Sequence, residues 1–158
     1  MRTRLISALT ASVAALAVMV PAATPAAAST RYSFDVQTPF NTGTAAIGSA
    51  HAWGSIEFFN PTAFNFQISV KDACPADGYG AYVQIVYFSN TGTVGYSGWN
   101  WYQNNGCSQT AVSPTALITT GSFQINYLEI EVCERDNSGG TWRMGDCAWS
   151  NAKDNPYA

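Results

Sequence analysis

The residues from Ala63 to Lys71, AFNFQISVK, decide the fold class of this chain. Along them, apolar and polar side chains alternate without a break: Phe64, Asn65, Phe66, Gln67, Ile68, Ser69, Val70 and Lys71. Successive side chains of a strand point to opposite faces, so this pattern predicts a strand with one buried and one solvated face. After residue 28, alternation recurs and no sustained apolar spacing at the helical period is found. The sequence therefore predicts an all-β fold.

Two neighbouring segments extend this pattern. In the segment from Ala81 to Phe88, both the odd-numbered and the even-numbered residues are apolar apart from Gln84. This pattern predicts a central strand whose outer face is either covered or aromatic. Ser122 to Glu134 changes phase, because its apolar residues first occupy odd positions and then even ones. We expect a β-bulge near Tyr127 and Leu128 that keeps both sets inside.

Four more segments are strand candidates: Arg31 to Gln37, Ala52 to Phe59, Val94 to Tyr102 and Thr141 to Trp149. Turn residues separate them, as in Asn60-Pro61-Thr62 and Asn90-Thr91-Gly92. About seven or eight short strands at this spacing predict an antiparallel β-sandwich or a barrel-like variant of it. No repeat or linker divides the chain, so we expect a single β domain over residues 29–158.

The first 28 residues have the organisation of an export signal. Arg2 and Arg4 precede an apolar run from Leu5 to Val20, and Ala26-Ala27-Ala28 offers a small-residue cleavage site. The run is shorter than the roughly 20 apolar residues that cross a bilayer. We expect residues 1–28 to be a signal peptide and the mature protein to be secreted and extracellular, with no membrane span.

The charge of the chain disfavours nucleic acid as a partner. The net charge is −3, and it becomes more negative once Arg2 and Arg4 are removed. Phosphate binding draws its affinity from clustered Lys and Arg. We therefore expect no nucleic-acid binding. We also expect a monomer whose partner is an extracellular glycan or protein.

The four cysteines, Cys74, Cys107, Cys133 and Cys147, form an even set in a small exported domain and predict two disulfides. Four cysteines allow three connectivities. Pairing of neighbours in the sequence, Cys74 with Cys107 and Cys133 with Cys147, suits a meander of hairpins and is favoured here. No pair has the CxxC spacing typical of zinc sites.

Candidates for catalysis and metal binding are few. His51 is the only histidine, so a Ser-His-Asp site would depend on it alone. Glu129 and Glu131 would lie roughly 7 Å apart on one strand face, which a solvated face explains as well as a glycosidase pair does. The segment 72–80 has oxygen ligands for calcium but lacks the EF-hand spacing, and Glu134, Asp136 and Asp146 make a weaker case. We expect no enzyme activity, metal or cofactor.

The aromatic run Tyr96-Ser97-Gly98-Trp99-Asn100-Trp101-Tyr102 is the most suggestive feature, and Gln103-Asn104-Asn105 follows it directly. In an extended strand Trp99 and Trp101 share a face, where indoles can stack on sugar rings while amides bond hydroxyls. Tryptophan also fills cores, so the same residues have a structural interpretation. The candidate ligand-binding residues are Tyr96, Trp99, Trp101, Tyr102 and Asn104.

Three functional hypotheses follow. The first is a secreted, non-catalytic protein that binds polysaccharide or cell-wall glycan through these aromatic residues. The second is an exported inhibitor or toxin-like protein that contacts a protein partner through a disulfide-braced loop, at residues 74–80 or 104–108. The third is a glycan hydrolase that uses Glu129 or Glu131 with another carboxylate.

The surroundings of the cysteines carry a resemblance: Val70 to Tyr82, Val132 to Asp136, Gly145 to Ala148, and the closing Asn155-Pro156-Tyr157. On these motifs the chain resembles a group of small exported actinomycete proteins with two disulfides, and the resemblance covers most of residues 29–158. The resemblance implies a disulfide framework and an exported protein. The group is functionally uncharacterised, so it assigns no catalytic or binding residue.

Overall fold

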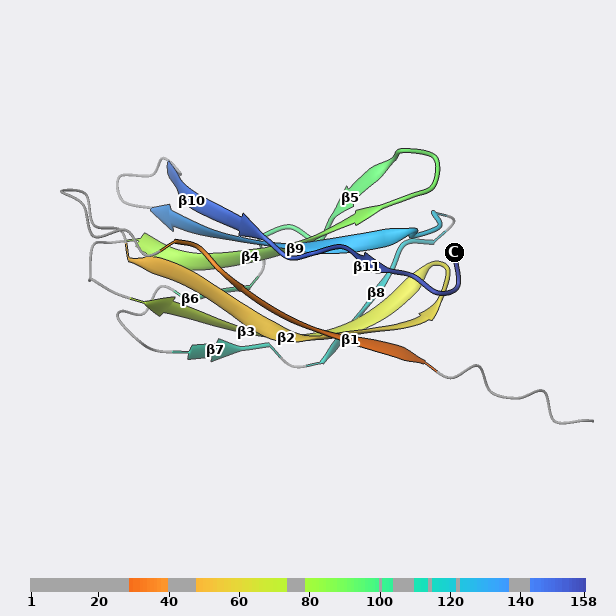
Figure 1. The fold of residues 1–158 in the computed structure, drawn as a ribbon, viewed down its shortest axis with the longest axis horizontal. Helices are drawn as coiled ribbons and strands as arrows, with labels where there is room; N and C mark the ends of the chain where they lie inside the picture. Colours follow the sequence, from red (N-terminus) through yellow and green to blue (C-terminus); the bar gives the residue numbers. More distant parts are fainter. Residues whose placement is uncertain are drawn as a thin grey trace, which may run out of the picture.

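A computed structural model of the chain contains two antiparallel sheets stacked face to face (Figure 1). It describes residues 29–39, 48–73, 79–99, 101–103, 110–113, 115–121, 123–136 and 143–158. The first sheet is formed by β1 (Thr30–Gln37), β2 (Ser49–Asn60), β3 (Ala63–Ala73), β7 (Thr110–Val112) and β8 (Ala116–Thr119). The second is formed by β4 (Tyr79–Phe88), β5 (Val94–Tyr96), β6 (Trp101–Gln103), β9 (Tyr127–Asp136), β10 (Arg143–Trp149) and β11 (Lys153–Asp154). The predicted all-β, sandwich-like fold is confirmed.

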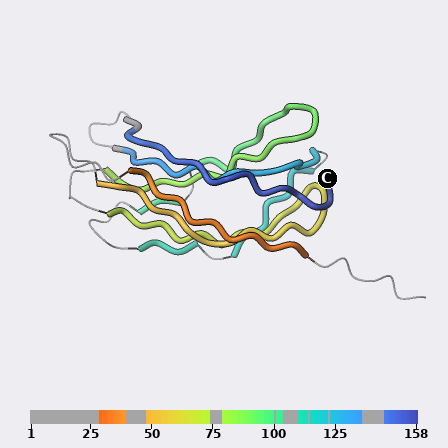
Figure 2. The backbone as a smooth tube through the Cα atoms, in the orientation of Figure 1, coloured from red at the N-terminus to blue at the C-terminus, as the bar shows by residue number. Residues whose placement is uncertain are grey.

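The chain builds the first sheet as a meander and then moves between the sheets (Figure 2). β1, β2 and β3 pair in sequence, and the short strands β7 and β8 both pair with the far side of β3. In the second sheet the order is β10, β9, β4 and β5, with β6 also beside β4 and β11 beside β9. The described residues thus form eleven strands. The sequence predicted seven or eight, because strands of two to four residues leave too short a pattern to detect.

The alternation of residues 63–71 is present in β3 as predicted. Phe64, Phe66, Ile68 and Val70 are buried between the sheets, whereas Gln67 is exposed on the opposite face. From the second sheet, Val83, Ile85, Ile130 and Val132 complete the same core. Apolar burial of this kind stabilises a fold by roughly 25 cal/mol per Å² removed from water.

β4 is the central strand of the second sheet, as its apolar sequence predicted. It pairs with β9 on one side and with β5 and β6 on the other. Its odd-numbered residues Ala81, Val83 and Ile85 face the core. The even-numbered Tyr82 and Val86 lie on the outer face but are also buried, which fits an outer face covered by aromatic side chains.

The prediction of a β-bulge near Tyr127 and Leu128 is wrong. The pairing of β9 with β4 runs without a shift from Tyr127 opposite Phe88 to Asp136 opposite Tyr79. The phase change arises because β9 begins at Tyr127, and Ile125 reaches the core from the preceding non-strand segment, where its N–H donates to Pro61 O at 2.7 Å. An apolar residue outside a strand does not follow the two-residue period. The alternation pattern therefore placed Ile125 wrongly in the strand.

The prediction of a single strand from Val94 to Tyr102 is also wrong. β5 and β6 are separate strands that pair with different parts of β4, at residues 86–88 and 81–83. Between them Gly98 adopts φ 76°, a left-handed conformation that breaks a strand and that glycine adopts without strain. Trp99 and Trp101 therefore do not lie on one continuous strand.

Cys133 and Cys147 form a disulfide between directly paired residues of β9 and β10. This confirms one of the two favoured pairs. Cys74 and Cys107 lie outside the described residues. A disulfide in a small all-β protein is consistent with an oxidising compartment such as the extracellular space.

A glycine in the middle of the first sheet gives a stability prediction. Gly54 of β2 lies opposite Phe34 of β1 and Ile68 of β3, and a Cβ there would lie 2.0 Å from the backbone oxygen of Gln67. Because that oxygen belongs to a strand, relief requires a backbone shift. We expect Gly54→Ala to lower the free energy of unfolding by about 1 to 3 kcal/mol, measured by urea denaturation.

The adjacent Ser55→Ala is the control for this prediction. Ser55 points to the other face of the sheet from Gly54 and is only half-buried. We expect its free energy of unfolding to stay within about 0.5 kcal/mol of the wild type. Equal stability of the two variants would show that the strand moves aside at no cost.

Candidate functional site

The outer face of the second sheet carries side chains from five strands. In β4 the outward residues are even-numbered, and in β9 they are odd-numbered, because these are the parities that leave the core. The paired outward residues of these two central strands are Tyr82 with Cys133, Gln84 with Glu131, Val86 with Glu129, and Phe88 with Tyr127. β5, β6 and β10 add their outward residues at the margins.

Three of these marginal residues are large and exposed. Tyr96 of β5 is 59% exposed, Tyr102 of β6 is 50% exposed, and Trp149 of β10 is 47% exposed. Tyr96 pairs with Val86 and Tyr102 with Tyr82, so their backbones lie about 14 Å apart along β4. Trp149 pairs with Glu131, on the other side of β4. We call Tyr96, Tyr102 and Trp149 the aromatic face.

Two polar side chains lie between the three aromatic residues. The amide of Gln84 donates a hydrogen bond to the carboxylate of Glu131, and both residues are buried although they point outward. The second Glu131 oxygen lies 3.7 Å from Cys133 Sγ, a contact only, since a disulfide sulfur has no proton to donate. The pair therefore fixes polar groups between the residues of the aromatic face.

Stacked side chains hold one end of the aromatic face in place. The rings of Tyr102 and Tyr82 stack with centroids 5.3 Å apart and planes 18° apart. The Arg135 guanidinium lies 5.4 Å from the Tyr82 ring and 4.8 Å from the Trp99 ring, within the range of cation–π attraction. Tyr102 is therefore presented on a supported, preordered base.

Four of the five candidate ligand-binding residues are described, and these four do not lie on one surface. Tyr96 and Tyr102 lie exposed on the outer face, as the hypothesis requires. Trp101 points the other way and packs against Phe66 at 4.6 Å, and Trp99 is only partly exposed and engaged by Arg135. Asn104 lies outside the described residues. Trp99 and Trp101 therefore do not lie together on one surface, because Trp101 packs against the core and Trp99 against Arg135 of the outer face.

Trp149 was missed by reasoning from the sequence. It stands two residues after Cys147, so in a strand it shares the face of the disulfide. The sequence therefore showed that Trp149 and Cys147 share a face. It did not show that this face is solvated, because that depends on which side of β9 meets the core.

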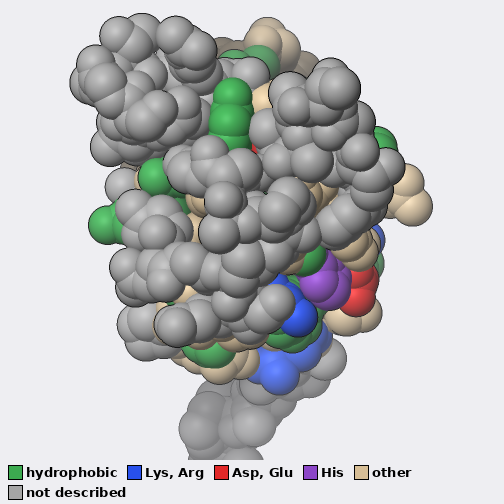
Figure 3. Space-filling model, turned by 90° about the vertical axis from the view of Figure 1, so that its left-hand side faces the viewer, with side chains coloured by type: hydrophobic (Ala, Val, Ile, Leu, Met, Phe, Trp, Pro, Cys, Tyr) green, Lys and Arg blue, Asp and Glu red, His purple; other side chains and the backbone are tan. Residues whose placement is uncertain are grey.

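The candidate catalytic groups are separated in the structure. His51 Nε2 lies 2.8 Å from Asp35 Oδ1, and its ring packs against Trp53 at 4.6 Å, on the outside of the first sheet. Figure 3 shows the histidine at the surface beside an acidic side chain. Glu129 and Glu131 lie on the opposite sheet, and Glu131 is engaged by Gln84. Nothing in the described residues joins His51 to either glutamate.

The sites weighed for metals give no donor set within the described residues. Glu131, Cys133 and Cys147 are close together, but both sulfurs are in the disulfide. Glu134 points inward and accepts a hydrogen bond from Thr38 Oγ1 at 2.6 Å. Most of the segment 72–80 lies outside the described residues, as does the side chain of Asp136.

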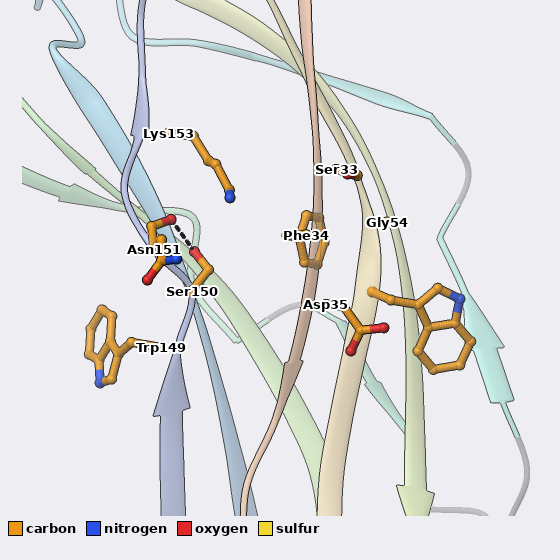
Figure 4. A pocket seen from close by; sticks show the side chains of 9 residues that line it. Ser33, Phe34, Asp35, Gly54, Trp149, Ser150, Asn151 and Lys153 are labelled. Atoms are coloured by element: carbon orange, nitrogen blue, oxygen red, sulfur yellow. Dashed lines mark hydrogen bonds between the residues drawn. The ribbon is translucent and has the colours of Figure 1, made fainter.

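A second feature, an open cleft of about 570 Å³, lies where the edges of the two sheets face each other. Ser33, Phe34 and Asp35 of β1 line one wall, with Trp53 and Gly54 behind them. Trp149, Ser150, Asn151 and Lys153 line the other (Figure 4). Trp149 thus borders both this edge cleft and the aromatic face.

Ion pairs flank the cleft on the first sheet. Arg31 donates to Glu57 at 2.9 Å, and hydrogen bonds from Ser29 and Arg31 hold the pKa of Glu57 below its usual range. The side chains of Arg31 and Asp35 are 66% and 75% exposed, so each keeps hydrogen-bonding capacity toward solvent.

Comparison with known proteins gives no assignment. The chain matches no family model, and no curated protein or solved structure shows significant similarity to it. The described residues contain no helix that is long and apolar enough to span a membrane.

Proposed function

We propose that this protein is an exported, non-catalytic binding protein whose aromatic face binds an extracellular polysaccharide or cell-wall glycan. The signal-like residues 1–28 and the Cys133–Cys147 disulfide support export. The resemblance to small exported actinomycete proteins points the same way. The binding role depends on the surface.

The observation that carries the proposal is the arrangement of Tyr96, Tyr102 and Trp149. All three are about half exposed and project from one sheet face around the buried Gln84–Glu131 pair. Exposed aromatic rings on a supported backbone provide apolar area for sugar faces at little entropic cost. Binding of this kind requires no titrating group, whereas hydrolysis requires two carboxylates placed across the scissile bond.

The test is a titration of purified protein with soluble glycans, read by tryptophan fluorescence, and pull-down on insoluble cellulose, chitin and peptidoglycan. Saturable binding is expected. Tyr102→Ala and Trp149→Ala should each weaken it about tenfold, since a lost aromatic contact is worth roughly 1.5 kcal/mol. Tyr96→Ala should weaken it to a similar extent.

Phe59→Ala is the matched control. Phe59 is an exposed aromatic residue at the end of β2, on the first sheet, so its loss should leave glycan affinity unchanged. If every glycan fails to bind the folded protein, or if binding survives all three substitutions on the aromatic face, the proposal is wrong.

A further inference from the structure

Among the described residues β1 pairs only with β2, so its other edge is open within this part of the chain. Thr38 N donates to Ala50 O at 2.9 Å in the same register, and hydrogen-bonded pairs recur at every second residue of an antiparallel ladder. The even-numbered residues of β1 therefore bond to β2, whereas Arg31, Ser33 and Asp35 direct their N–H and C=O groups toward the open edge.

Apart from the charges of Arg31 and Asp35, β1 lacks the features that usually protect a sheet edge. It pairs with β2 over eight residues with no bulge, it contains no proline, and its inward side chains are the apolar Tyr32, Phe34 and Val36. Regular, unprotected edges are templates for an added strand. Main-chain hydrogen bonds then supply affinity, and pockets for alternate side chains supply specificity.

The edge cleft lies beside this edge. Phe34 forms part of its wall on β1, and Trp149 and Lys153 approach from the second sheet (Figure 4). A strand added to β1 would point every second side chain toward the second sheet, and hence into this cleft. The cleft provides the space that such side chains need.

We propose that the added strand is β1 of a second copy of this chain, paired antiparallel about a twofold axis at Ser33. The order of outward side chains on β1 is positive, neutral and negative, at Arg31, Ser33 and Asp35. When two copies of β1 pair antiparallel about Ser33, Arg31 of each copy lies opposite Asp35 of the other. The dimer therefore has two such ion pairs. The charge pattern of β1 is therefore self-complementary.

The backbone register agrees with the charges. Residues 31, 33 and 35 are the ones whose N–H and C=O face the edge, so the same register joins them as hydrogen-bonded pairs. It also sets Tyr32 of each copy beside Phe34 of the other, facing the clefts. Arg31 and Asp35 already contact Glu57 and His51, but both remain largely exposed and can accept a second partner.

Pairing of this kind joins two first sheets into one continuous sheet. A twofold axis perpendicular to that sheet leaves the aromatic faces of both copies on the same side of the dimer. If the proposed function holds, a dimer would engage one extended polymer at two places and gain avidity without new contacts. The dimer itself does not depend on glycan binding, and it replaces the monomer expected from the sequence.

Sedimentation equilibrium on the purified protein tests the proposal. The wild type should show a concentration-dependent dimer. Arg31→Asp and Asp35→Arg should each weaken self-association at least about tenfold, because each sets like charges opposite one another. A one-to-one mixture of the two variants should form a heterodimer close to wild-type strength, since both ion pairs are then restored. Misfolded variants could not do this.

A backbone substitution tests the same edge without altering charge. Ser33→Pro removes an N–H that faces away from β2, so it keeps the ladder within the chain but blocks the added strand. It should abolish the dimer, and Ser33→Ala should keep it. A wild-type protein that stays monomeric at every concentration overturns the proposal, as does a dimer that survives Ser33→Pro or a variant mixture that fails to associate.

Discussion

Replacing Phe64 with alanine should lower the free energy of unfolding by about 3 to 5 kcal/mol, a large part of the roughly 5 to 15 kcal/mol that stabilises a typical domain. Phe64 is fully buried on β3. Its ring lies 6.0 Å from Phe58, 6.3 Å from Phe66 and 6.3 Å from Tyr87, which belongs to the second sheet. The substitution would leave a cavity where the two sheets meet, and backbone on both sides limits its collapse.

Phe59→Ala is the matched control for this prediction. Phe59 is skipped in the pairing of β2 with β3, where Phe58 lies opposite Phe64 and Asn60 opposite Ala63, and it is exposed. Its loss should change stability by only about 0.5 kcal/mol. Urea denaturation of both variants gives the comparison. Losses of equal size would show that Phe64 does not connect the two sheets.

Removing the Cys133–Cys147 disulfide should cost about 3 kcal/mol. The two residues are 14 apart in sequence, and the bond limits the conformations of the unfolded chain that this loop would otherwise sample. The bond also joins β10 to β9 immediately before Trp149, next to a register shift between Met144 and Cys147. If the proposed function holds, we therefore expect weaker glycan binding as well as lower stability.

The variant to use is the double substitution Cys133→Ala and Cys147→Ala. Chemical reduction is less selective, since it would also break the second disulfide that the sequence predicts, and a single substitution would leave a reactive thiol. The urea midpoint should fall and the slope should rise somewhat, because the unfolded chain is less compact without the cross-link. A loss below about 1 kcal/mol would indicate that strand pairing alone already restricts this loop, contrary to the entropic account.

Much of the fold was predictable because alternation is a local property. The apolar side chains of residues 63–71 share one face only if the segment is a strand, and β3 is a strand that buries this face. The prediction was wrong where a residue buries its side chain without belonging to a strand, as Ile125 does. It was also wrong where Gly98, directly before Trp99, breaks the single strand expected from Val94 to Tyr102.

The candidate site was predictable only in part, for a related reason. Tyr96 and Tyr102 were named from the sequence and lie on the outer face, but Trp101 was assigned to the same surface and packs in the core. Aromatic residues are compatible with either environment. Whether a given ring is inside depends on the strand beside it, and for Trp101 that strand is β4.

By itself the sequence determined the strand periodicity, the apolar faces of β3 and β4, and a pairing of Cys133 with Cys147 among the favoured options. Only the tertiary structure decided that β5 and β6 share one neighbour, that Trp149 joins Tyr96 and Tyr102 on one face, and that β1 has an unpaired edge among the described residues. The physical reason is that a period of two follows from the geometry of each residue. Strand order instead depends on which distant segments bury one another's apolar surface, and no local pattern contains that information.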